Sequence, residues 1–177
     1  MRIIAGEWRG RPIDAPPGDA TRPTSDRARE ALFSMLASRI GSFDGLRVAD
    51  LFAGTGALGL EALSRGAAHC SFVEQDRAAM ETLRCNVARL GAGARADVRA
   101  QSALHPLCGP FDLVLIDPPY ASGLAGEALA AWRDALAPGA WVSVETGARE
   151  TVAADGYTLE AERSYGKAKL SLLTRDG

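Results

Sequence analysis

The chain has 177 residues, a formal net charge of −2, 47% hydrophobic residues and 24% charged residues, which is an ordinary globular composition. This length suits one compact domain, residues 1–177, and is short for two. No apolar stretch is as long as a membrane helix and no basic-then-apolar leader is present, so we expect a cytoplasmic protein without membrane contact. The charge balance also lacks the cationic excess typical of a free-standing nucleic-acid-binding protein.

The cysteines and histidines do not form the spacings of a metal site or a disulfide framework. Cys70, Cys85 and Cys108 are odd in number and widely separated, and His69 and His105 are isolated in the sequence. Neither a CxxC pair nor a Cys/His cluster occurs. We therefore predict reduced thiols and no metal.

The N-terminal segment concentrates arginine. Residues 2–14, with Gly6 and Gly10, indicate a short hairpin or extended arm, and residues 15–19 form a turn-rich break. Guanidinium groups suit phosphate and RNA contacts, although an arginine-biased genome would produce the same pattern. Helix capping does not explain the presence of Arg29; contact with RNA and local ion pairs on a solvated helix face are the two interpretations. The predicted RNA contacts are Arg2, Arg9, Arg11, Arg22 and Arg27.

Hydrophobic spacing from Thr24 predicts a helix that ends near Gly41. Strands and helices then alternate: strand 46–52, helix 57–65, strand 70–74, helix 77–90, strand 95–100, strand 113–116, helix 126–136, strand 141–145, strand 157–163 and strand 169–174. Alternation predicts a parallel sheet with helices on both faces, and the last two strands predict an antiparallel hairpin at one edge. We expect an α/β fold with a seven-stranded, mostly parallel sheet, in which residues 1–20 form an arm and residues 21–177 the core with its leading helix.

A glycine-rich loop lies between the first strand and the following helix. Residues 50–59 contain G-x-G-x-x-G, with Gly54 and Gly56 suited to a tight turn and close ligand approach. Glu74 ends the next strand about 20 residues later, where an acid typically binds ribose hydroxyls. The pattern fits NAD and S-adenosylmethionine equally, and a purely structural crossover is the alternative. The predicted cofactor contacts are Asp50, Phe52, Gly54, Gly56, Glu74, Gln75, Ser102 and Thr24.

Asp117-Pro118-Pro119-Tyr120 follows the apolar strand 113–116. The Asp117 carboxylate and the Pro118 carbonyl can each accept one N–H of an aromatic amine, which localises the nitrogen lone pair and stabilises its developing charge. The prolines restrict the backbone, and Tyr120 can stack on a base. A Pro-Pro turn capped by Asp117 is the structural alternative. Because both motifs end strands of a parallel sheet, we predict that residues 117–120 are catalytic.

The two motifs together suggest methyl transfer to the amine of a nucleobase, and three other functions remain open at this point. An adenine N6 or cytosine N4 amine in DNA or another RNA suits the same corner, but the chain has no room for a separate target-recognition domain. An NAD-dependent oxidoreductase needs a hydride-transfer acid or base, and no histidine or Tyr-Lys pair is placed for it. A non-catalytic assembly factor would not need Asp117.

The chain resembles the RsmD family of bacterial rRNA methyltransferases. The segments that carry the resemblance are 2–13, RIIAGEWRGRPI; 21–33, TRPTSDRAREALF; 50–67, DLFAGTGALGLEALSRGA; 73–77, VEQDR; and 113–120, LVLIDPPY. The resemblance implies a class I methyltransferase fold and S-adenosylmethionine-dependent methylation of N2 of a guanine, position 966 in the usual 16S rRNA numbering. It implies a substrate on the assembled or assembling small subunit, and we expect a monomer. Family members often carry Asp or Asn at the position of Ser102.

Overall fold

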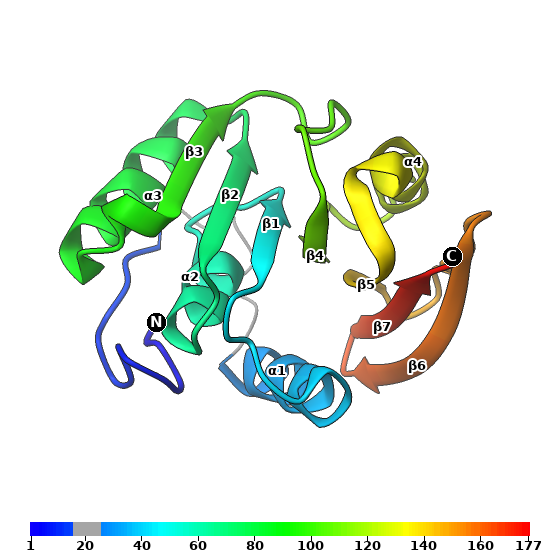
Figure 1. The fold of residues 1–177 in the computed structure, drawn as a ribbon, viewed down its shortest axis with the longest axis horizontal. Helices are drawn as coiled ribbons and strands as arrows, with labels where there is room; N and C mark the ends of the chain where they lie inside the picture. Colours follow the sequence, from blue (N-terminus) through cyan, green and yellow to red (C-terminus); the bar gives the residue numbers. More distant parts are fainter. Residues whose placement is uncertain (16–25) are drawn as a thin grey trace.

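The computed structural model describes residues 1–15 and 26–177, and its centre is one seven-stranded sheet (Figure 1). The strand order is β3-β2-β1-β4-β5-β7-β6, with β1 to β5 parallel and β6 and β7 antiparallel at one edge. The strands are β1 Arg47–Leu51, β2 His69–Glu74, β3 Ala96–Ala100, β4 Phe111–Ile116, β5 Leu136–Gly147, β6 Tyr157–Tyr165 and β7 Ala168–Arg175. The helices are α1 Asp26–Ile40, α2 Ala57–Ser64, α3 Arg77–Leu90 and α4 Leu124–Trp132, with short 3₁₀ turns η1 Gly93–Arg95 and η2 Arg133–Ala135. The predicted fold class is confirmed.

Two hydrophobic clusters cover the two faces of the sheet. Leu113 and Leu115 of β4 belong to the cluster that contains the apolar sides of α1, α2 and α3. Val114 and Ile116, which alternate with them, belong to the cluster that contains α4. The inner parallel strands β1, β2 and β4 are therefore buried on both sides, which explains their apolar runs, whereas the edge strand β3 is partly exposed.

Residues 1–14 of the arm fold back on themselves as a short hairpin: Arg2 and Pro12 form an antiparallel bridge, and backbone hydrogen bonds join residues 1–3 to residues 10–13. Ile3, Trp8 and Ile13 point into the core and are at most 4% exposed. Burial of large apolar side chains supplies the main stabilisation of such a loop. In Figure 1 the arm lies beside α2, toward the end of the sheet away from the arrowheads of β2 and β3.

The predicted helix 126–136 is wrong at both ends, because α4 covers Leu124–Trp132 and β5 begins at Leu136. Pro138-Gly139, which falls between the predicted helix 126–136 and the predicted strand 141–145, lies inside β5. The pairing of β4 with β5 shifts register from Phe111↔Leu136 to Leu113↔Trp141, so residues between them form a bulge. A bulge leaves residues unpaired, and proline is tolerated there because no ladder N–H is needed.

The lengths and polarity of the helices show whether any of them could span a membrane. Across residues 1–15 and 26–177, every helix is too short or too polar to cross a lipid bilayer. The predicted start of the first helix, at Thr24, lies outside the described residues.

Candidate active site

The order of the sheet reverses between β1 and β4, which are neighbours in space although β2 and β3 separate them along the chain. Ligands of open parallel sheets bind at the carboxyl ends of the strands beside such a reversal. The N–H of Asp117, just after β4, donates to the carbonyl of Leu51 at the end of β1, with an N–O distance of 3.4 Å. The loop after β1 and the corner after β4 therefore lie side by side.

Three glycines of the G-x-G-x-x-G motif are needed for different reasons; Gly54 and Gly56 lie in the loop after β1, and Gly59 lies in α2. Gly56 has a left-handed φ of +83°, and a Cβ on Gly59 would lie 2.3 Å from Phe72 Cε1, so packing requires a glycine at position 59. Gly54 has a φ of +57°, and among the described residues only the Phe52 carbonyl oxygen, at 4.0 Å, would lie within reach of a Cβ there. Within this part of the chain, Gly54 is thus the position at which a ligand can approach the backbone.

Glu74 joins the end of β2 to this loop. Its Oε2 accepts a hydrogen bond from Gly54 N at 2.8 Å, and its Oε1 accepts from Gln75 N and Asp76 N, each at 2.9 Å. Main-chain donors therefore fix the orientation of this carboxylate before any ligand binds. The geometry suits an acid that receives hydrogen bonds from ribose hydroxyls.

Asp50 lies beneath the loop and is only 1% exposed. Its Oδ2 accepts a hydrogen bond from Gly59 N at 2.9 Å, which ties β1 to the first turn of α2. Burial raises the pKa of the Asp50 carboxyl well above its usual range; the Gly59 bond lowers this pKa, and the negative charges of Asp117 and Glu74 raise it further. Asp50 is therefore an anchor of the loop, and its contact with a cofactor stays a prediction.

The corner Asp117–Tyr120 is held in place from two sides. The Tyr120 hydroxyl donates to Glu145 Oε1 at 2.9 Å, and Ser122 Oγ donates to the Pro119 carbonyl at 2.6 Å. Ala121 adopts a left-handed φ of +54°, a strained conformation for a residue with a Cβ. Strain of this kind persists only where neighbouring contacts impose it.

Glu145 and Glu150 supply those contacts, and the sequence reasoning missed both. Glu145 is an 8% exposed acid within β5, and a buried acid among apolar strand residues is the signal that could have identified it. Glu150 Oε1 accepts from Ala121 N at 2.6 Å and from Gly147 N at 3.1 Å, joining the corner to the end of β5. No local pattern distinguishes Glu150 from other surface acids.

Ser102 follows β3 and lies near the same edge. Gln101 N donates to the carbonyl of Glu74 at 3.2 Å, and Ser102 Oγ accepts from Leu104 N at 3.2 Å. The loop is anchored by Trp132 Nε1, which donates to the Ala103 carbonyl at 2.6 Å. The structure thus brings Asp50, Phe52, Gly54, Gly56, Glu74, Gln75 and Ser102 to the carboxyl ends of β1, β2 and β3, next to the corner. Thr24 lies outside the described residues.

The described members of the predicted RNA contacts, Arg2, Arg9, Arg11 and Arg27, lie on the arm and on α1 and not at the ends of these strands. Arg2 Nη1 donates to the Gly10 carbonyl at 2.7 Å, and Arg11 Nη2 donates to the Arg89 carbonyl, so both side chains also bond within the molecule. Arg9 and Arg27 are exposed, and Arg22 lies outside the described residues.

Arg29 is fully buried and has a structural role, so it is neither a surface contact for RNA nor part of a solvated helix face. It pairs with Asp26 at 2.9 Å and with Glu61 at 4.0 Å, and it donates to the carbonyl of Arg2. Burial lowers the pKa of this guanidinium, and the two acids oppose that shift.

Acids that gather at a strand edge can also coordinate metal ions. Among the residues that the structure describes, no group of three or more His, Cys, Asp or Glu side chains could hold a metal ion.

Known proteins match almost the whole chain. The family model described as Conserved hypothetical protein 95 matches residues 1–174. The Ribosomal RNA small subunit methyltransferase D of Escherichia coli K12 is 40% identical over 183 residues, covering 99% of this chain and 90% of the relative. The solved structure of yhhF from E. coli superposes with a TM-score of 0.87 at 38% identity, covering 99% of this chain and 98% of that one.

A more distant comparison concerns the fold alone. An RNA methyltransferase from Salinibacter ruber, solved with S-adenosyl-L-homocysteine, superposes with a TM-score of 0.69 at 15% identity, covering 88% of this chain and 94% of that one. The sheet order, the carboxyl-edge cluster and the full-length matches agree with one another. This chain belongs to the RsmD family, and its fold is that of the S-adenosylmethionine-dependent methyltransferases.

Proposed function

We propose that this protein transfers the methyl group of S-adenosylmethionine to the exocyclic N2 of a guanine in 16S rRNA, at the position 966 type of site. The observation that carries the proposal is the Asp117–Tyr120 corner beside the loop that contains Gly54, at the carboxyl ends of β4 and β1. Relatives named small subunit methyltransferases support rRNA as the substrate. The expected setting is a cytoplasmic monomer that acts on the small subunit or its assembly intermediate.

The residues around Gly54 fit a nucleoside cofactor. Within the described part of the chain, the backbone at Gly54 is open to a ligand, and the Glu74 carboxylate is already oriented by three main-chain N–H groups. In the proposed arrangement Glu74 binds the ribose, Asp50 and the glycine loop lie at the methionine end, and Ser102 lies at the adenine. Phe52, Gln75 and Thr24 are the further proposed contacts. S-adenosylmethionine supplies an electrophilic methyl group on a sulfonium sulfur.

Asp117 and Pro118 act on the amine in this proposal. An aromatic amine is a weak nucleophile because its lone pair is delocalised into the ring. The Asp117 carboxylate accepts one N–H and the Pro118 carbonyl accepts the other, which favours a tetrahedral nitrogen and stabilises its positive charge. Pro118 and Pro119 restrict the backbone, so these acceptors are ordered before the reaction.

Tyr120 orients the base. Its ring provides a stacking surface, a contact worth about 1–3 kcal/mol for a base in a single-stranded site. The hydrogen bond from its hydroxyl to Glu145 fixes the ring, so Glu145 is a positioning residue. The target guanine must leave its stack to reach this corner, which favours a looped or single-stranded region of RNA.

The arm remains a proposed RNA contact. Arg9 is its exposed arginine whose side chain forms no hydrogen bond or ion pair with the described residues, whereas Arg2 and Arg11 already donate to carbonyls. Arg27, at the start of α1, is the second exposed candidate. Arg22 is carried as a candidate from the sequence alone.

Methyl transfer can be tested with labelled S-adenosylmethionine and three substrates: small subunits, naked 16S rRNA and duplex DNA. The proposal expects label in small-subunit RNA and none in DNA. Label only in DNA would contradict rRNA as the substrate. Binding of NAD in place of S-adenosylmethionine in a cofactor titration would contradict methyl transfer itself.

A further inference from the structure

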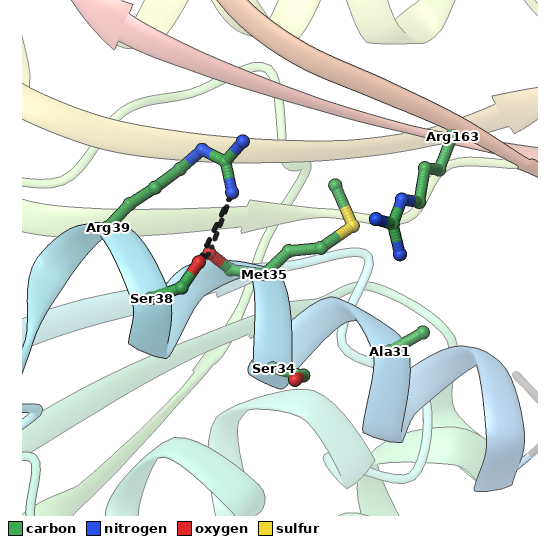
Figure 2. A pocket seen from close by; sticks show the side chains of 6 residues that line it. All are labelled: Ala31, Ser34, Met35, Ser38, Arg39 and Arg163. Carbon is green, nitrogen blue, oxygen red and sulfur yellow. Dashed lines mark hydrogen bonds between the residues drawn. The ribbon is translucent and has the colours of Figure 1, made fainter.

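A basic groove lies between α1 and β6, outside the residues assigned to catalysis or cofactor binding (Figure 2). We call it the α1–β6 groove, and its lining residues are Ala31, Ser34, Met35, Ser38, Arg39 and Arg163. Two arginines and two serines provide its polar groups, and among the described residues no acidic side chain lines it. Because the whole chain has a net charge of −2, this local composition is not a consequence of general basicity.

Both arginines of the groove have donors to spare. Arg39 Nη1 donates to the Met35 carbonyl at 3.2 Å and to Ser38 Oγ at 3.3 Å, which are long bonds. Neither Arg39 nor Arg163 forms an ion pair with any residue of the described part of the chain. Figure 2 shows the two guanidinium groups on either side of the Met35 side chain. The groove therefore presents paired positive charge above an apolar floor.

The register of the edge hairpin explains why Arg163 faces α1. The pairing of β6 with β7 shifts between Leu159 and Ala161. Beyond the shift, Ala161 and Tyr165 pack on the cluster that contains α1, and Arg163 lies between them on the same face. The neighbouring Glu162 points to the other face, where it accepts from Ser171 Oγ at 3.2 Å. The register shift between β6 and β7 thus places Arg163 on the face of the groove and Glu162 on the opposite face.

The same face of the sheet connects the groove to the corner. Arg163 pairs with Leu170 of β7, and Leu170 pairs with Glu145 of β5. Directly paired residues point to the same face, and two strand spacings separate Arg163 from Glu145 by about 9–10 Å. Glu145 in turn accepts the Tyr120 hydroxyl. The groove is therefore a short distance from the residue proposed to stack on the base.

We propose that the α1–β6 groove binds backbone phosphates of the RNA strand that flanks the target guanine. Guanidinium forks and serine hydroxyls are typical phosphate ligands, and such contacts set the register of a nucleic acid without reading its sequence. Met35 and Ala31 offer apolar surface to the ribose. This inference rests on the proposed function, because it requires an RNA substrate in the Asp117–Tyr120 corner.

The test uses the full-length variants Arg163→Ala, Arg39→Ala and their combination, with Arg84→Ala, an exposed arginine of α3, as the matched control. Fluorescence anisotropy measures the Kd of a labelled 16S rRNA fragment between 50 and 200 mM salt, a range over which phosphate contacts are strongly weakened (roughly 10³–10⁵-fold for 6–10 contacts). We expect the double variant to bind about tenfold more weakly, and the salt slope to fall by about 0.7 for each phosphate that is no longer neutralised. Arg163→Lys keeps the charge and should retain the slope.

Several results would overturn the groove as an RNA site. The double variant could show the same Kd and salt slope as Arg84→Ala while the wild type still methylates rRNA. Alternatively, the variants could bind naked RNA normally but lose affinity for the small subunit, which would assign the groove to a ribosomal protein. Failure of the wild type to methylate any RNA would instead contradict the proposed function. An unchanged melting midpoint and cofactor affinity in all variants separates these outcomes from misfolding.

Discussion

In the arm, polar groups only hold one part of the fold against another, whereas near the Asp117–Tyr120 corner they hold the proposed binding groups in position. In the arm, Glu61 of α2 accepts from the N–H groups of Ile4 and Ala5 at 2.9 and 3.0 Å, and Asp14 pairs with Arg89 at 2.6 Å. These groups hold the arm against α2 and α3. At the carboxyl edge, acids fix a loop or an aromatic hydroxyl around the backbone at Gly54, which is open to a ligand within the described part of the chain. The comparison teaches that an acidic residue supports the fold or belongs to the candidate active site according to its position relative to the strand ends, and that its charge in the sequence does not distinguish the two roles.

Glu61→Ala should give the largest effect on the supporting side. Glu61 and Arg29 are both fully buried, and Glu61 also pairs with Arg65 at 3.0 Å. Removing the acid leaves Arg29 partly uncompensated, which typically costs about 3–5 kcal/mol. Urea denaturation should show that loss in the free energy of unfolding. Glu81→Ala, an exposed acid of α3 paired with Arg77, is the control and should cost less than about 1 kcal/mol; an equal loss in both variants would contradict a buried support.

Asp117→Ala should give the largest effect on the chemical side. Loss of one preorganised acceptor at a developing charge lowers kcat by about 10²–10³-fold. Cofactor affinity, measured by calorimetry, should remain close to that of the wild type. Asp112→Ala is a matched control on β4, where Asp112 Oδ2 accepts from Arg47 N at the opposite end of the strand. Equal turnover by both variants would refute the role of the corner.

Tyr120→Phe tests the positioning role of Glu145 with a smaller expected effect. The substitution keeps the ring and removes one hydrogen bond, worth about 0.5–1.5 kcal/mol, so kcat/KM should fall by about 2–10-fold. Tyr157→Phe is the control, because its hydroxyl bonds to the Leu129 carbonyl at 2.6 Å. A similar fall in kcat/KM for both tyrosines would indicate a general loss of stability and not a loss of orientation.

Arg9→Ala should give the smallest effect. Arg9 is exposed and its substitution should change the free energy of unfolding by less than about 0.5 kcal/mol. Because the arm lies away from the corner, RNA binding should weaken less than in Arg163→Ala. Anisotropy under the conditions used for the groove variants measures the change in RNA affinity, and urea denaturation measures the change in stability. A larger loss of affinity for Arg9→Ala would make the arm, and not the groove, the main RNA surface.

The sequence predicts the centre of the sheet well because the inner strands are buried on both faces, and Val114 and Leu115 of β4 therefore fall in one apolar run. It also predicts the two motifs at the carboxyl edge, since each is contiguous in the chain. The bulge around Pro138-Gly139 was missed because the same dipeptide also ends helices. Glu145 was missed because the group it orients, Tyr120, is 25 positions away.

The arm shows the same limit. The sequence predicts a short hairpin or extended arm, but the bond from Ile4 N to Glu61, which holds the arm against α2, spans 57 positions and no local pattern encodes it. Arg29 looks like a surface cation in the sequence, and only the fold reveals that it is buried beside Glu61. Contacts of this kind depend on tertiary packing, which single-sequence periodicity does not contain.

The most direct test of the central claim identifies the methylated nucleoside. Small subunits that lack the modification are incubated with the protein and labelled S-adenosylmethionine, and the 16S rRNA is digested and analysed by chromatography with mass spectrometry. The account predicts N2-methylguanosine at a single position with the wild type and almost none with Asp117→Ala at matched cofactor occupancy. Label confined to adenosine or cytidine, or N2-methylguanosine formed equally by Asp117→Ala, would contradict it.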